Sequence, residues 1–235
     1  MPHFLSPWFP VTSDFGLVAA SLPATVDAYV QWQAAIGHTF AVHELTDGLA
    51  TSLETLAPLS VTFRRTLFVP TTAAWTAFFR SGIQGSDPAG PMPVLSEILG
   101  VQTMRICSTE PTAAYPAVCW EVFAPRTAGG DRHYHRRSIC AMNDGGRWVF
   151  LSVGAPFPFE DVALYSVRRK RDRFNHATLA SYLSHFQLHP FEEAFYTSGS
   201  TEPSVLLDTR APDPIAVPEF TFEEVADGKP WSRSA

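Results

Sequence analysis

The sequence predicts an α+β protein with a mainly antiparallel meander sheet and helices packed on one face of that sheet. Segments of helical periodicity lie early in the chain and again after residue 158, and segments that alternate like strands lie between them. Glycine- and proline-rich turns separate the segments. Hydrophobic residues make up 46% of the 235 residues and charged residues 17%, which is enough apolar material for one core.

The first half of the chain alternates strands and helices. Ser21 is suited to cap a helix that has Pro23 in its first turn, where a missing N–H costs little, and Gly37 is suited to end it. Between positions 61 and 69, apolar and polar residues alternate as in a strand. In chain order we expect strands at 15–20, 39–45, 61–69, 75–79 and 101–108, and helices at 21–36, 48–57 and 94–99.

The stretch from Ala117 to Glu160 predicts three further strands, at 117–123, 133–142 and 147–151. The Asn-Asp-Gly-Gly sequence at 143–146 supplies residues that tolerate positive φ, which tight hairpin turns need. We therefore expect the last two strands to form a hairpin. Side-chain alternation places His133, His135 and Arg137 on one face of this hairpin.

Helical periodicity then predicts one helix at 159–174 and a second one that Asn175 caps. Prolines at 203, 212, 214, 218 and 230 argue against long regular elements near the end of the chain. We expect a single domain over residues 1–198, followed by an extended or partly disordered acidic tail over 199–235.

The formal net charge of −6 is unevenly distributed. Residues 126–173 contain ten Lys or Arg and five Asp or Glu, whereas residues 199–235 contain three basic and seven acidic side chains. Because opposite charges attract, the acidic tail is expected to lie across the basic segment. Charge segregation of this kind also suits the steering of a protein partner.

Cys107, Cys119 and Cys140 lie in expected strands with apolar neighbours, and their spacing does not match a zinc site or a disulfide framework. We expect all three to be reduced, which indicates a cytoplasmic protein. The chain has no run of about 20 apolar residues, the length needed to span a bilayer, so no membrane segment is expected.

Two histidines and one glutamate are the candidate residues for catalysis or metal binding. His133 and His135 on one strand face, with Glu121 on the preceding strand, are the weak candidates for catalysis or for metal binding. In an alternative hypothesis these residues act with Arg136 and Arg137 on a small or phosphorylated substrate. We expect no metal and no cofactor, because nucleotide-binding, metalloprotease and serine-hydrolase motifs are not found.

A second alternative is nucleic-acid binding through the basic run at 168–173. The overall acidity of the chain and the spread of these side chains around a helix argue against this function.

Three short motifs, at 143–148, 157–160 and 171–174, resemble a pattern in uncharacterised bacterial cytosolic α+β proteins, over roughly residues 60–196. Stand-alone acidic proteins of this type are similar in kind to immunity proteins that neutralise toxins. Because no nucleophile or cofactor motif is found and charge is segregated, we expect a non-catalytic protein-interaction module, of the immunity-protein kind, that binds a toxin or another effector. The contact surface is expected to include the hairpin around 143–148 and the loop 81–93. The expected binding residues are Arg136, Arg137, Asn143, Asp144, Arg147, Trp148, Arg168, Arg169 and Arg171.

Overall fold

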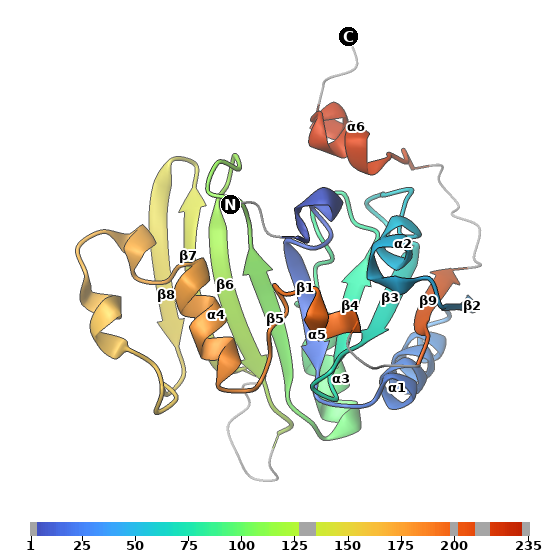
Figure 1. Cartoon of the computed structure of the whole chain (residues 1–235), viewed down its shortest axis with the longest axis horizontal. Helices are drawn as coiled ribbons and strands as arrows, with labels where there is room; N and C mark the ends of the chain where they lie inside the picture. The colour runs from blue at the N-terminus through green and yellow to red at the C-terminus, as the bar shows by residue number, and fades with distance from the viewer. Residues whose placement is uncertain (1–3, 127–134, 198–201, 210–216, 232–235) are drawn as a thin grey trace.

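The structure, a computed structural model, describes residues 4–126, 135–197, 202–209 and 217–231. Within these residues nine strands form one antiparallel sheet in the order β2-β9-β3-β4-β1-β5-β6-β7-β8 (Figure 1). The strands are β1 (Asp14–Val18), β2 (Phe40–Leu45), β3 (Arg65–Pro70), β4 (Thr76–Arg80), β5 (Thr103–Ser108), β6 (Ala117–Phe123), β7 (His135–Asp144), β8 (Arg147–Val153) and β9 (Ser204–Thr209). The helices are α1 (Leu22–Ala35), α2 (Gly48–Glu54), α3 (Pro91–Leu99), α4 (His176–Ser184), α5 (Ala194–Thr197) and α6 (Phe222–Ala226).

The α+β class is confirmed, but the sheet is a meander only in part. The strands β5 to β8 lie side by side in chain order. By contrast, β1 lies between β4 and β5, and β9 lies between β3 and β2. The hairpin β7–β8 therefore forms one end of the sheet, with β8 as an edge strand.

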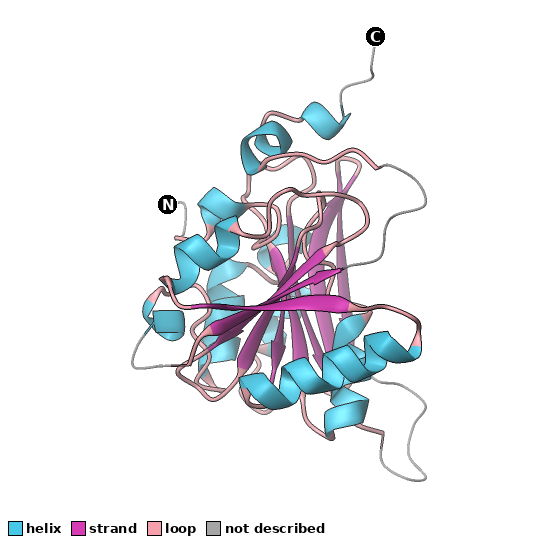
Figure 2. Cartoon of the chain, turned by 90° about the vertical axis from the view of Figure 1, so that its right-hand side faces the viewer, coloured by secondary structure: helices cyan, strands magenta, loops and turns pink. Residues whose placement is uncertain are grey.

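Helices cover both faces of the sheet, so the expectation of helices on one face is wrong (Figure 2). The strand β1 has a core on each of its faces, because all five of its residues are buried. On one face Phe15 and Trp120 belong to the core that includes residues of α2, α4 and α5. On the other face Phe68 and Phe78 pack with residues of α1 and α3.

The segment after residue 198 supplies a strand to the interior of the sheet. β9 pairs with β2 over six residues and with β3 over four, and the side chain of Leu207 is fully buried. The domain boundary expected at residue 198 is therefore wrong, because proline-flanked residues 204–209 are apolar enough to pair inside a sheet.

Two acidic side chains of this segment pair with arginines outside the basic segment 126–173. Asp208 forms an ion pair with Arg65 at 3.4 Å, and Glu219 forms one with Arg64 at 3.4 Å. Because β9 and β8 are seven strand spacings apart, roughly 34 Å at about 4.8 Å per spacing, these carboxylates cannot cover the hairpin. The expected contact between tail and basic segment is wrong for the described part of the tail.

The helix expected at 159–174 is wrong, whereas α4 after the Asn175 cap is confirmed. In place of the first helix there are two short 3₁₀ turns, η2 (Val162–Ser166) and η3 (Lys170–Asp172). Two further turns of this kind, η1 (Ser6–Trp8) and η4 (Lys229–Trp231), lie near the chain ends. Phe157 and Phe159 stack on each other and pack against Trp120, and these tertiary contacts outweigh the local periodicity.

The three cysteines lie side by side on β5, β6 and β7. A disulfide joins Cys119 to Cys140, so the expectation that all three are reduced is wrong. Cys107 is a free thiol, and burial raises its pKa to about 12. In the described parts of the chain, no helix has the length and apolar character of a membrane span.

Candidate functional site

The predicted hairpin is confirmed and forms the frame of the candidate site. In its turn, Asn143 Oδ1 accepts a hydrogen bond of 2.7 Å from the Gly146 N–H, while Gly145 and Gly146 both adopt positive φ. Asp144 pairs with Arg147 across the strands, and both side chains are exposed. The predicted binding residues at the hairpin tip therefore face solvent.

A β-bulge near the start of β7 changes the predicted alignment of the histidine face. The bulge pairs His135 with Phe123 but Arg137 with Val122, so the side chains of His135 and Arg137 point to opposite faces. His135 Nε2 lies 3.2 Å from Glu121 Oε1, as expected for two residues of one site. His133 lies outside the described residues.

Glu121 is part of an ionic network on the face of the sheet that α1 and α3 partly cover. The guanidinium of Arg105 donates two hydrogen bonds of 2.9 Å to Asp14 and one of 3.0 Å to Glu121. Burial raises the pKa of Asp14 although Arg105 opposes the shift. Within the described residues no three His, Cys, Asp or Glu side chains are grouped as metal ligands would be.

Arg137 is a structural residue, so its prediction as a binding residue is wrong. Its side chain is fully buried and donates to both carboxylate oxygens of Glu160, with Nη2–Oε2 at 2.6 Å. It also donates to Ser152 Oγ and to the carbonyls of Val153 and Gly154. The pair holds the segment after β8 against the hairpin. Arg137 therefore cannot hold an anionic substrate, as the alternative enzyme hypothesis requires.

The other predicted arginines differ in exposure and contacts. Arg136 is exposed, with its guanidinium 4.7 Å from the ring centre of Phe157. Arg168 and Arg169 are exposed, and Arg171 forms a loose ion pair with Asp172 at 3.6 Å. The basic run therefore adopts 3₁₀ and extended structure instead of a helical face. Nucleic-acid binding through these residues stays a prediction.

The loop 81–93 lies several strands away from the hairpin. Ser86 in this loop is fully buried and donates to the carbonyl of Val11, which ties the loop to the N-terminal segment. The loop follows β4, and five strand spacings, roughly 24 Å at about 4.8 Å each, separate β4 from β8. One contact surface that includes both elements therefore stays a prediction.

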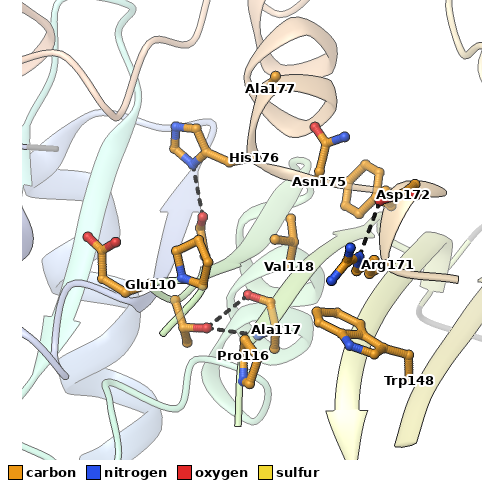
Figure 3. A pocket seen from close by; sticks show the side chains of 14 residues that line it. Glu110, Pro116, Ala117, Val118, Trp148, Arg171, Asp172, Asn175, His176 and Ala177 are labelled. Carbon is orange, nitrogen blue, oxygen red and sulfur yellow. Dashed lines mark hydrogen bonds and ion pairs between the residues drawn. The ribbon is translucent and has the colours of Figure 1, made fainter. Parts of the chain in front are cut away.

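A cleft of about 530 Å³ lies beside the hairpin, on the face of the sheet that α4 covers (Figure 3). Its walls come from the end of β5, the start of β6, Trp148 on β8, and the chain that leads from η3 into α4. Trp148 and Arg171 are the two predicted binding residues that line it. Most of the remaining wall is apolar, and Pro111, Pro116, Val118, Phe174 and Ala177 contribute to it.

Polar groups gather at one end of the cleft. Ser108 Oγ lies 2.9 Å from Nδ1 of His176. Glu110 also lines the cleft, and its Oε1 accepts a hydrogen bond of 3.1 Å from Ser6 Oγ (Figure 3). His176 is the first residue of α4, where Asn175 Oδ1 caps the helix by accepting from the Thr178 N–H at 3.0 Å. Burial lowers the pKa of His176, and the negative charge of Glu110 partly opposes this shift.

The sequence analysis missed Ser108, Glu110 and His176 as site residues. The Asn175 cap was recognisable and placed His176 in the first helical turn. Its contact with Ser108, 68 positions away, depends on how α4 packs on the sheet, which no local pattern encodes.

The opposite face of the hairpin is apolar and partly exposed. Leu151 and Val153 on β8 have exposed fractions of 49% and 59%. On this face α3 packs against β1, β5 and β6, and α1 packs against β3. The edge strand thus presents an apolar surface on the side away from the cleft.

Comparisons with protein-family models, with curated protein sequences and with solved structures found no match to this chain.

Proposed function

We propose that this chain is a protein-interaction module of the immunity-protein kind, which binds and neutralises a partner protein through its β8 edge. The observation that carries the proposal is the exposure of Leu151 and Val153 on an edge strand. An edge strand offers unpaired backbone groups, and apolar side chains on it mark a surface that a partner strand or loop can cover.

Charge supports the proposal and indicates the sign of the partner surface. The exposed arginines 136, 147, 168 and 169 belong to the segment 126–173, which has a formal excess of five positive charges. A partner with an acidic surface would be attracted at long range and then held by apolar contact with β8. The proposed partner is therefore an acidic toxin or effector.

Affinity capture with matched variants tests this function. The wild-type chain should recover one protein in stoichiometric amount from the native host, and Val153→Glu should lose it. Val42→Glu is the matched control, because Val42 is also 59% exposed but lies on β2, at the opposite edge of the sheet. Recovery of no stoichiometric protein, or equal recovery with Val153→Glu, would contradict the proposal.

A further inference from the structure

The cleft on the opposite side of the hairpin from the proposed partner surface has the arrangement of groups that acyl transfer needs. A hydroxyl, an imidazole within hydrogen-bond distance and a nearby carboxylate lie together at one end of a concave, mainly apolar space. The volume of about 530 Å³ is in the range of small-molecule sites, about 300–1,000 Å³.

The hydroxyl and the imidazole come from rigid elements. Ser108 is the last residue of β5, and its N–H donates at 2.7 Å to the carbonyl of Ser13. His176 begins α4, and its ring packs 4.3 Å from that of Phe191. Both side chains are thus held in place, so the distance of 2.9 Å between Ser108 Oγ and His176 Nδ1 is built into the fold.

We propose that this cleft is a serine esterase site, in which Ser108 is the nucleophile and His176 the general base, for carboxylic esters with a small apolar or aromatic acyl group. Ser108 Oγ attacks the ester carbonyl carbon while its proton passes to Nδ1 of His176. Collapse of the tetrahedral intermediate breaks the carbon–oxygen bond of the ester, and the leaving alcohol takes the proton from His176. Water then attacks the acyl-serine, with His176 again as base, and releases the carboxylic acid.

The surrounding groups have separate roles in this step. The carboxylate of Glu110 favours the imidazolium that forms during the transfer, in line with its effect on the pKa of His176. Ala177 lines the same cleft, and its N–H lies in the first turn of α4, where such groups have no intrahelical acceptor. We assign this N–H to the developing oxyanion.

The substrate class follows from the walls. Val118, which pairs with Ser108 across β5 and β6, lies next to the nucleophile, and Phe174 and Trp148 extend the apolar wall along the cleft, which suits a short aliphatic or aromatic acyl chain.

Covalent labelling tests the nucleophile directly. The full chain is incubated with a fluorophosphonate probe, and the modified residue is located by mass spectrometry. Labelling at Ser108 supports the proposal, whereas an unlabelled chain, or labelling only at another residue, overturns it. Ser184→Ala is the matched control, because this serine is exposed on α4 and hydrogen-bonds only locally to the carbonyl of Ser181.

Hydrolysis of p-nitrophenyl acetate and butyrate gives the second readout. Ser108→Ala should abolish release of nitrophenolate above buffer, and His176→Ala should lower it by about 10²–10⁴-fold, as expected for loss of a general base. With the wild type the rate should rise with pH and reach its plateau below neutrality, because the pKa of His176 is lowered. Ala177→Phe keeps the backbone N–H and places a larger side chain in the cleft, so it should reduce the butyrate rate more than the acetate rate.

Retained hydrolysis in folded Ser108→Ala, or identical substrate preference in Ala177→Phe, would refute this assignment. The partner proposal would be unaffected, because Leu151 and Val153 lie on the opposite face of β8 from Trp148.

Discussion

Replacement of Arg137 by methionine removes one half of a fully buried ion pair. The side chains of Arg137 and Glu160 have no exposed surface, and the variant leaves the Glu160 carboxylate with hydrogen bonds from the Tyr165 hydroxyl and the Phe157 N–H alone. Removing one partner of a buried pair typically costs about 3–5 kcal/mol. We expect Arg137→Met to lower the free energy of unfolding by that amount.

Urea unfolding followed by circular dichroism measures this loss. The control is Arg136→Met at the neighbouring position, where the arginine is exposed and the expected loss is less than about 1 kcal/mol. The double variant Arg137→Met/Glu160→Met leaves no unpaired charge and should recover most of the stability. A loss below about 1 kcal/mol in Arg137→Met alone would refute the structural role of this pair.

Acid should weaken the same pair. Burial by itself would raise the pKa of Glu160, but the hydrogen bonds from Arg137, Tyr165 and the Phe157 N–H bring it below the ordinary value of 4.5. A carboxyl with a lowered folded-state pKa stabilises the protein above its unfolded pKa, and this contribution is lost as the pH falls through the folded value. The wild type should therefore lose stability below about pH 4.5, and Glu160→Gln should show a shallower loss.

Three further predictions concern other parts of the fold. Leu207→Ala should lower the unfolding free energy by about 2–5 kcal/mol in a urea titration, because Leu207 is fully buried; a stable chain ending at residue 203 would contradict the place of β9 in the sheet. Gly154→Ala should lower the free energy of unfolding by more than about 1 kcal/mol, because the added Cβ would lie 2.5 Å from the Arg136 carbonyl oxygen and the φ of Gly154 is +84°. Gly90→Ala is the control, because a Cβ at Gly90 meets no atom within 4 Å. Equal thermal midpoints for the two variants would argue against the close approach at Gly154. Cys107 should react with iodoacetamide only after denaturation, because its thiol is buried and has a raised pKa; rapid labelling of the native chain, followed by mass spectrometry, would contradict this.

Local patterns were sufficient where one segment determines its own structure. The Asn-Asp-Gly-Gly turn, the Asn175 cap and the alternating strands from 103 to 153 each depend on neighbouring residues, and the structure confirms them. The predicted 159–174 helix failed because Phe157, Phe159 and Glu160 bind to the hairpin and to Trp120, which lie outside that window.

Site residues were likewise predictable where a local pattern marks them and not where they depend on tertiary contacts. Trp148 was recognisable because it follows the predicted turn at 143–146, and Arg171 because it belongs to the basic run at 168–173. The bulge that turns the side chains of His135 and Arg137 to opposite faces cannot be recognised from the alternation of apolar and polar residues, since it adds one residue to an otherwise regular strand. The Ser108–His176 contact joins a strand end to a helix start, and only the assembled sheet brings them together.

The insertion of β9 between β2 and β3 also sets the order in which the chain can assemble during its synthesis. Among the strands that the structure describes, β2 pairs with β9 and with no other. The ribosome synthesises residues 204–209 long after residues 40–45, so β2 cannot pair with β9 until most of the polypeptide has been synthesised. A nascent chain stalled before that point would expose an unpaired apolar edge at β3, which is a natural binding place for chaperones.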